Sequence, residues 1–264
     1  MALVSNSIIT LTTDFGLDDP FVGIMKGVIL SVNPVAKIVD ITHGVPAHDI
    51  LAGALMLRSG YAYFPPGTIH LAVVDPGVGS QRRPLLVVGE QYAFVGPDNG
   101  LFSPIIQSDT ELKVFHLVEE KYFLKPVSKT FHGRDIFAPV AASLSRGTPP
   151  ELFGPLVDDW IRLDWPSPRS TGRGRLRGTV LHVDRFGNLI TNISLTDLPW
   201  ATPVEISIGN RKIERVCESY AEAEDGELFA ILGSAGLLEI SIKQGSAARL
   251  LGVGSRHELE VRFR

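Results

Sequence analysis

The stretch IHLAVVDPG, residues 69–77, is an apolar run that ends on an acid and a Pro-Gly turn. Two earlier stretches follow the same plan, SIITLTTDFG at 7–16 and AKIVDITHG at 36–44. The segments between these three, near 20–32 and at 49–64, have helical apolar spacing. Strands that alternate with helices in this way predict a parallel sheet with right-handed crossovers.

The remainder of the chain contains more strands than helices. Two apolar runs around Gly-Glu-Gln at 84–100 predict a hairpin, and 135–147 predicts one more helix. After about residue 155 a segment rich in Pro, Gly, Ser and Arg precedes short alternating runs with closely spaced turn signals, which favour an antiparallel barrel or sandwich. We therefore predict an α/β N-terminal domain with a mainly parallel sheet (1–163), a linker (164–177) and a smaller C-terminal antiparallel β-barrel domain (178–264).

Composition places the chain among ordinary globular proteins. Its 264 residues carry a formal net charge of −4, with 20% charged and 44% hydrophobic residues, so we expect no nucleic-acid partner. The start MALVSNS lacks a basic region followed by a long apolar run, and no apolar run approaches the roughly 20 residues that span a bilayer, so we expect no membrane partner. The single cysteine, Cys217, agrees with a reducing compartment and a cytoplasmic location, and its alternating surroundings predict a packed strand residue.

Acids stand where the predicted parallel strands end. Asp14, His43 and Asp75 fall at carboxyl ends of strands, where ligands bind in such sheets. The stretch VDPGVGSQRRP that holds Asp75 lacks the endings of the known phosphate loops. Gly77 and Gly79 remove side chains, so backbone and ligand can approach closely, although a plain Asp-Pro-Gly turn is the alternative.

Asp14 is a candidate for binding a vicinal diol such as a ribose, because a carboxylate accepts two hydrogen bonds. One of the nearby acids Asp18 and Asp19 is expected to cap the helix that follows. The stretch TFHGRD at 130–135 is ambiguous by itself, because its arginine and aspartate could form a surface ion pair and its histidine could be a satisfied polar residue. Asp184 and Asn188 flank a Phe-Gly turn that predicts a hairpin.

The same acids together with His43, His48 and His132 also permit a dinuclear metal hydrolase. Against this interpretation, the sequence contains no His-x-His pair at ligand spacing, and the arginines that follow Asp75 would repel a cation. We therefore expect neither a metal nor another cofactor.

Six motifs occur in a fixed order along the chain: TDFG (13–16), VDPGVGSQRRP (74–84), GPDNGLF (96–102), TFHGRDIFAP (130–139), DRFGNLITNI (184–193) and GSAGLLEI (233–240). In this order they resemble the S-adenosylmethionine hydroxide adenosyltransferase family, also called S-adenosyl-L-methionine hydrolases and related to fluorinases and chlorinases. The resemblance runs from about residue 8 to the C-terminus. It implies an α/β domain joined to a β-barrel, a homotrimer with sites between subunits, and hydrolysis of S-adenosyl-L-methionine to adenosine and methionine.

The resemblance also implies roles for individual residues. A water would be positioned and activated by Asp75, Arg82 and His132. The substrate would be bound by residues from both halves of the chain: Asp14 at the ribose hydroxyls, Phe131 beside the reacting centre, Asn188 at adenine, Asp184 at the methionine ammonium, and Ser234 with the following backbone through Glu239 at the far end of the pocket.

Two departures from the halide-using relatives favour water over halide as the nucleophile. Those relatives have a serine after the aromatic residue of the fourth motif, where this sequence has Gly133, and a tyrosine in place of Asp75. A halide-dependent 5′-halo-adenosine synthase and a non-catalytic adenosine- or S-adenosylmethionine-binding protein stay open as alternatives. The role of Arg83 is also open.

Overall fold

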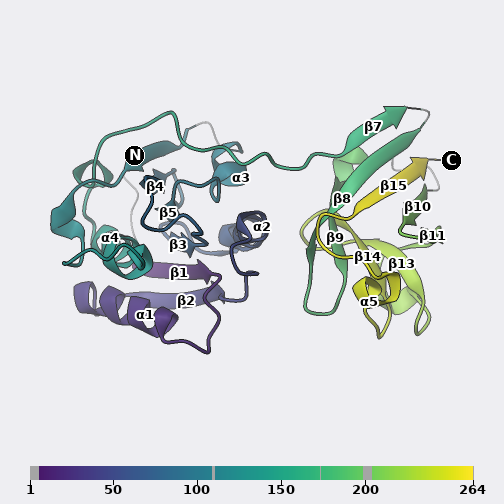
Figure 1. Ribbon diagram of the computed structural model, residues 1–264, viewed down its shortest axis with the longest axis horizontal. Coiled ribbons are helices and arrows are strands. Elements are labelled where there is room, and N and C mark those ends of the chain that lie inside the picture. The colour runs from purple at the N-terminus through teal and green to yellow at the C-terminus, as the bar shows by residue number, and fades with distance from the viewer. Residues whose placement is uncertain (1–5, 109–110, 173, 199–203, 264) are drawn as a thin grey trace. The chain divides into compact units, whose positions relative to one another are not determined.

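The computed structural model (Figure 1) describes residues 6–108, 111–172, 174–198 and 204–263. Residues 1–5, which form most of the start MALVSNS considered above, lie outside this range. The chain divides into two compact units, Met1–Asp164 and Trp165–Arg264, and each is described by itself.

The N-terminal unit contains a sheet of six strands: β1 (Ile8–Thr13), β2 (Lys37–Thr42), β3 (Ile69–Val73), β4 (Pro84–Val88), β5 (Ala93–Pro97) and β6 (Lys113–His116). Their order across the sheet is β2-β1-β3-β5-β4-β6. β2, β1, β3 and β5 are mutually parallel, whereas β4 runs antiparallel to both β5 and β6. The prediction of a mainly parallel sheet with a hairpin at 84–100 is confirmed.

The helices of this unit are α1 (Phe21–Val32), α2 (Ile50–Gly60), α3 (Ser103–Ile106) and α4 (Ala138–Ser145), with short helical turns η1 (Tyr61–Tyr63), η2 (Glu120–Tyr122), η3 (Gly133–Phe137) and η4 (Pro150–Leu152). The helix predicted at 135–147 is present as α4, but the turn η3 before it is a π-helix. Such wider turns recur at functional sites.

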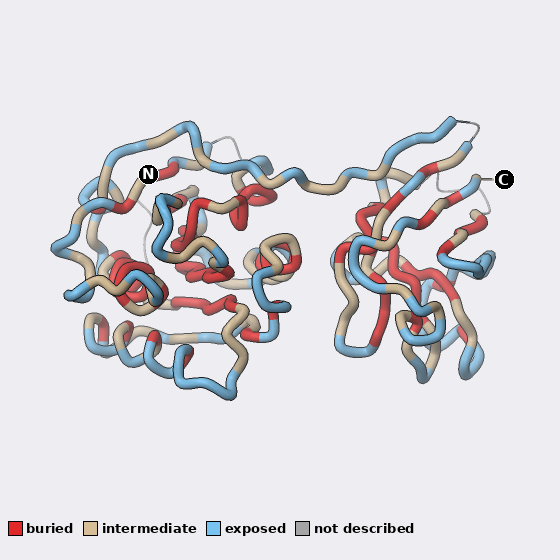
Figure 2. The backbone as a smooth tube through the Cα atoms, in the orientation of Figure 1, coloured by how far each residue is buried: buried red, intermediate tan, exposed pale blue. Residues whose placement is uncertain are grey.

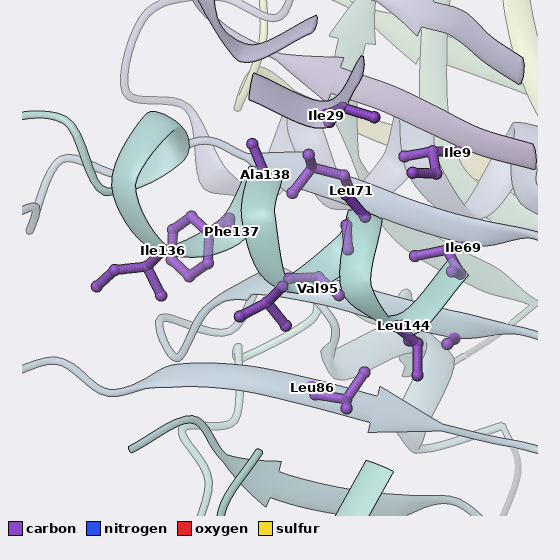
Figure 3. Close-up of a cluster of buried hydrophobic side chains, with 14 of the residues drawn as sticks. Ile9, Ile29, Ile69, Leu71, Leu86, Val95, Ile136, Phe137, Ala138 and Leu144 are labelled. Carbon is purple, nitrogen blue, oxygen red and sulfur yellow. The ribbon is translucent and has the colours of Figure 1, made fainter. Parts of the chain in front are cut away.

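The two faces of the sheet are covered by different helices. Alternate residues of β1 and β3, including Ile9 and Leu71, pack against α1 and α4 in one buried cluster (Figure 3). The opposite face meets α2, where a Cβ on Gly53 would lie 2.9 Å from a methyl group of Val74. Figure 2 shows the central strands buried along their length. Because both faces are covered, the ends of the strands are where polar groups can collect.

One local expectation at the start of α1 is wrong. Neither Asp18 nor Asp19 caps the helix; the N-cap position is Pro20, and no side chain caps the helix there. The proline ring holds φ at −76°, close to the helical value, and the Pro20 carbonyl accepts the N–H of Ile24 at 2.9 Å. The helix therefore begins without a carboxylate.

The C-terminal unit is built from β7 (Arg169–Gly172), β8 (Arg175–Val183), β9 (Leu189–Ser194), β10 (Val204–Ile208), β11 (Arg211–Ile213), β12 (Val216–Cys217), β13 (Leu228–Leu232), β14 (Leu237–Ile242) and β15 (Glu258–Phe263), with η5 (Leu195–Asp197), η6 (Tyr220–Glu222) and helix α5 (Ala247–Leu251). The strand order is β11-β10-β15-β8-β9-β14-β13-β12, and β7 pairs with β8. The sheet is curled and antiparallel except for the β12–β13 pair. Closure into a barrel stays a prediction.

Two sequence-based expectations about this unit have different outcomes. The stretch predicted as a linker, 164–177, contains β7 and the start of β8, which pair antiparallel. All four residues of β7 are exposed, so no hydrophobic alternation marks this strand in the sequence. Cys217 is buried in β12, as predicted. Among the helices of the described residues, none is long and apolar enough to cross a membrane.

Candidate active site

Asp75 and Arg82 stand at the two ends of the loop that joins β3 to β4. Nε of Arg82 donates to both carboxylate oxygens of Asp75, at 2.9 and 3.0 Å, and Nη2 donates to Oδ2. The two side chains are only 6% and 4% exposed. The loop is closed by its own hydrogen bonds, including Val78 N–H to the Asp75 carbonyl at 3.2 Å. A side-on, bidentate pair of this kind fixes the carboxylate in one orientation.

The same loop contacts the segment that carries the histidine. Gly79 has φ +77°, and a Cβ there would overlap the carbonyl oxygen of Lys129. Gly77, in contrast, has ordinary room, since the nearest atom to its Cβ would be the Ser80 hydroxyl at 3.4 Å. The steric requirement for glycine therefore lies at position 79, and it serves the approach of one backbone to another.

His132 lies directly before the π-helical turn η3 and faces Arg82. Its Nδ1 is 2.8 Å from Nη2 of Arg82, so the arginine lies between the carboxylate of Asp75 and the imidazole. Burial, and next the charge of Arg82, lower the pKa of His132 below 6.5, while Asp75 and Asp135 act in the opposite direction. The imidazole is therefore neutral at neutral pH.

Phe131 belongs to an aromatic cluster with Phe15 and Phe21. The ring centroid of Phe131 lies 6.0 Å from that of Phe15 and 5.4 Å from that of Phe21, and both pairs of rings meet edge to face. The guanidinium of Arg134 stacks over Phe131 at 5.3 Å and donates to the buried Asp135. The predicted ion pair of Arg134 and Asp135 is thus present, but its carboxylate lies in the interior, where it also accepts from the Ser128 N–H at 2.8 Å.

Asp14 follows β1 directly and is tied to a neighbouring turn. Its Oδ2 accepts the backbone N–H of His48 at 2.9 Å, and its side chain is 8% exposed. His43 is buried beside it, with Nδ1 2.8 Å from the Thr13 hydroxyl. A carboxylate offers about four lone-pair positions, so Asp14 keeps capacity for hydroxyl donors.

Arg83 points to a different set of partners from Arg82. It donates to the buried Asp98 at 2.9 Å through Nε, and to the side chain and carbonyl of Asp159 at 2.6 and 2.9 Å. The other oxygen of Asp98 accepts the N–H of Ile161 at 2.7 Å. Arg83 therefore anchors the segment around residue 160 to the end of the sheet, which answers the question left open by the sequence.

In the C-terminal unit, Asp184 and Asn188 close the turn between β8 and β9. Oδ1 of Asp184 accepts the N–H groups of Phe186 and Asn188, at 2.9 and 2.8 Å, and Oδ2 accepts the Asn188 amide at 2.9 Å. Gly187 in the same turn has φ +87°. The predicted hairpin is confirmed, and the aspartate orients the asparagine side chain.

Glu239 and Ser234 lie on the neighbouring β13–β14 hairpin. Ser234 is exposed in its turn, whereas Glu239 is buried in β14 and accepts the Tyr220 hydroxyl at 2.8 Å. Burial raises the pKa of the Glu239 carboxyl above its usual range, and the charge of Asp184 acts in the same direction. Burial, and next the bond to Glu239, raise the pKa of Tyr220 to about 12. Two acids and a phenol thus share one region.

Each unit therefore brings its own predicted residues together. The N-terminal unit assembles Asp75, Arg82 and His132 into one hydrogen-bonded chain. Sequence reasoning missed Tyr220, whose partner is 19 residues away, and the edge-to-face contacts of Phe15 and Phe21 with Phe131. Phe15 stands beside Asp14 in the TDFG motif, so its position was a usable signal.

Within the described ranges, no group of three or more His, Cys, Asp or Glu side chains could hold a metal ion. Asp75 instead pairs through both carboxylate oxygens with the guanidinium of Arg82.

Comparison with known proteins agrees with this division of the chain. Sequence models of the SAM hydroxide adenosyltransferase N-terminal and C-terminal domains match residues 9–154 and 178–260. A crystal structure of an uncharacterized conserved protein from Thermotoga maritima is similar with a TM-score of 0.89 and 34% identity, over 97% of this chain and 99% of that one.

The chain is also similar to curated proteins along most of its length. The (R)-S-adenosyl-L-methionine hydrolase of Thermus thermophilus is 40% identical over 91% of this chain and 94% of its own, and that of Methanocaldococcus jannaschii is 37% identical over 96% and 95%. A fluorinase of an Actinoplanes species is 28% identical over 73% of this chain and 74% of its own. With both domain models matched in order and relatives of this similarity along the chain, the protein belongs to the SAM hydroxide adenosyltransferase family.

Proposed function

We propose that this protein hydrolyses S-adenosyl-L-methionine to adenosine and L-methionine by in-line attack of a water on C5′. The observation that carries the proposal is the hydrogen-bonded chain of Asp75, Arg82 and His132 beside the carboxyl end of β3, in which the side chains of Asp75 and Arg82 are buried. The hydrolases of T. thermophilus and M. jannaschii, to which the chain is similar, support the choice of substrate.

The chemistry needs positioning more than it needs a metal or cofactor. The sulfonium of the substrate leaves as a neutral thioether, so the barrier lies in aligning a weak nucleophile with the C5′–S bond. Alignment of this kind supplies about 7–11 kcal/mol. Asp75, oriented by Arg82, and His132 hold the water and activate it. The side chains of Asp75 and Arg82 are almost fully buried. Bulk water therefore does not compete with the bound water for their hydrogen bonds.

The remaining predicted residues bind the substrate. Asp14 accepts hydrogen bonds from the ribose hydroxyls, and Phe131 with its aromatic neighbours flanks the reacting centre. Asn188 faces adenine with its amide oriented by Asp184.

The amino-acid end of the substrate meets a second set of groups in the C-terminal unit. Asp184 approaches the methionine ammonium, and this cation is attracted to a region that contains the two acids Asp184 and Glu239. Ser234 and the backbone that leads to Glu239 line the far end of the pocket.

Isotope labelling tests the proposed reaction directly. Purified protein is incubated with S-adenosyl-L-methionine in H₂¹⁸O. The products are separated by chromatography, and mass spectrometry measures the ¹⁸O content of each. We expect equal amounts of adenosine and methionine, with the label in adenosine only. No adenosine from folded protein, or label in the amino-acid product, would refute the proposal.

The alternatives give different results in the same assay. A halide-dependent relative would form 5′-chloro-5′-deoxyadenosine when chloride is added; Gly133 and Asp75 argue against it, and we expect none. A non-catalytic nucleoside-binding protein would bind adenosine without turnover. A metal hydrolase would lose activity after exhaustive chelation, whereas we expect full activity because Arg82 neutralises Asp75.

We further propose a cytoplasmic homotrimer of two-domain subunits, with boundaries at 1–163 and 178–264 and a closed C-terminal barrel. Each site combines the Asp75 set of one subunit with the Asp184 set of a neighbour. Inactive Asp75→Asn and Asp184→Asn proteins are mixed in equal amounts, unfolded and refolded together. If subunits assemble at random, about a quarter of the sites combine an intact Asp75 from one subunit with an intact Asp184 from its neighbour, and these sites should be active. Native mass spectrometry measures the subunit number, and no restored activity in mixed trimers would contradict the shared site.

A further inference from the structure

The carboxylate of Asp184 is largely occupied by its own turn. A carboxylate offers about four lone-pair positions for hydrogen bonds. Oδ1 of Asp184 accepts the backbone N–H groups of Phe186 and Asn188, and Oδ2 accepts the side-chain amide of Asn188. Only one position, on Oδ2, is left. An ammonium group has three N–H donors, so Asp184 alone does not satisfy the ammonium of an amino acid.

Glu239 is the neighbouring acid, and one of its oxygens is unused. Oε2 accepts the hydroxyl of Tyr220 at 2.8 Å, whereas Oε1 accepts no hydrogen bond from the described residues. Oε1 lies against the backbone of Gly233, where a Cβ would overlap it. Gly233 directly precedes Ser234 in the turn between β13 and β14. The unused oxygen therefore stands beside the turn that carries Ser234.

No cation of the protein compensates Glu239 among the residues that the structure describes. The ion pairs found in this part of the C-terminal unit all involve other acids. Glu239 is only 8% exposed, and burial together with the charge of Asp184 raises the pKa of its carboxyl. A buried acid without a partner is costly. A cation supplied by a ligand would therefore be strongly attracted to this position.

Tyr220 holds the Glu239 side chain in its observed orientation. The ring of Tyr220 packs edge to face on the fully buried Phe229, with centroids 5.9 Å apart. This contact places the hydroxyl against Oε2 of Glu239 and leaves Oε1 for another donor. Burial, and next the bond to Glu239, raise the pKa of Tyr220 to about 12, so the hydroxyl keeps its proton and stays a donor.

We propose that the carboxylate of Glu239 binds the α-ammonium of the substrate through Oε1, with Oδ2 of Asp184 as a second acceptor, and that Tyr220 is the positioning residue that holds Glu239 for this role. This role rests on the proposed function and defines what the substrate must carry, an adenosyl sulfonium with an ammonium group. The ammonium supplies the cation that both acids lack. Adenosyl sulfonium compounds without an ammonium should therefore bind weakly.

Two competitors separate the ammonium from the rest of the amino-acid end. S-Adenosyl-3-(methylthio)propylamine keeps the ammonium and lacks the carboxylate, whereas S-adenosyl-4-(methylthio)butanoate keeps the carboxylate and lacks the ammonium. Each is added to S-adenosyl-L-methionine, and its inhibition constant is measured from the release of methionine. With wild-type protein we expect the propylamine to compete at least about tenfold more tightly than the butanoate. A propylamine that competes no better than the butanoate would overturn the inference.

Tyr220→Phe and Glu239→Gln test the two residues, and Glu205→Gln is the matched control. Tyr220→Phe keeps the ring on Phe229 and removes the hydroxyl, and Glu239→Gln keeps the shape and removes the charge. We expect KM for S-adenosyl-L-methionine to rise about three- to tenfold in the first variant and about 10- to 100-fold in the second, with kcat within about twofold of wild type. Glu205 is equally buried, at 7% exposed, but bonds to Lys212, and its variant should keep wild-type kinetics.

The pattern across the competitors distinguishes a binding role from a structural one. In Glu239→Gln the inhibition constant of the propylamine should rise and that of the butanoate should not, because Glu239 attracts only the cation. Equal losses for both competitors, or a loss of kcat at unchanged KM, would overturn the inference. If a variant does not fold, the wild-type comparison of the two competitors still decides. Absence of adenosine from wild-type protein would instead refute the proposed function, and calorimetric titration with the two competitors would then test the ammonium site by itself.

Discussion

His70 makes the stability of the N-terminal unit depend on pH. It is fully buried in β3, with Nδ1 2.8 Å from the Thr10 hydroxyl of β1 and its ring stacked on Phe94 at 5.1 Å. Burial lowers its pKa from 6.5 to about 3. As pH falls below 6.5 the unfolded chain takes up a proton that the folded chain refuses, so this contribution is complete above pH 6.5 and is lost down to about pH 3.

The size of the effect follows from the difference between the two pKa values. The slope approaches about 1.4 kcal/mol per pH unit, and between pH 6.5 and about pH 4.5 the free energy of unfolding falls by about 2 kcal/mol through His70 alone. Urea unfolding at several pH values, followed by fluorescence, measures it. His70→Phe keeps the stack on Phe94 and removes the titration, so its stability should fall less steeply with pH than that of wild type.

Thr10→Val is the matched control for this measurement. It removes the hydroxyl partner of His70 but keeps the buried imidazole. We expect this variant to be less stable at every pH and to retain the wild-type slope. Identical slopes for wild type and His70→Phe over this range would refute the reasoning, whatever their absolute stabilities.

Three further predictions concern the loop between β3 and β4. Asp75→Asn should lower kcat about 10²–10⁴-fold in protein that is folded by circular dichroism; activity near wild type would exclude a role of Asp75 in activating the water. Gly79→Ala should destabilise by about 1–3 kcal/mol or more, because its Cβ overlaps the Lys129 carbonyl at φ +77°, and an unchanged Tm would contradict this. Arg83→Leu should cost about 3–5 kcal/mol by leaving Asp98 buried without its partner, with kcat per folded site nearly unchanged; a large loss of kcat would place Arg83 in the site.

Much of the fold could be read from local patterns. The stretches at 7–16, 36–44 and 69–77 form three adjacent parallel strands, and the helices between them lie where apolar spacing indicated. Strand β7 was not predicted, because its residues are all exposed and it is held by backbone pairing with β8. Hydrophobic periodicity indicates which residues are buried, so it cannot identify a strand that has no buried face.

The chemical groups that are available can be read along the chain: acids Asp14 and Asp75 after parallel strands, and a histidine in the TFHG motif. How these groups face one another depends on the packing of the folded chain. Arg82 and His132 are 50 residues apart and meet because Gly79 lets one loop approach the backbone at Lys129. Alternation of apolar residues is a local property of the chain, whereas the direction of a hydrogen bond depends on which group is packed beside it. For that reason the order of the aspartate, arginine and histidine in space had to come from the folded protein.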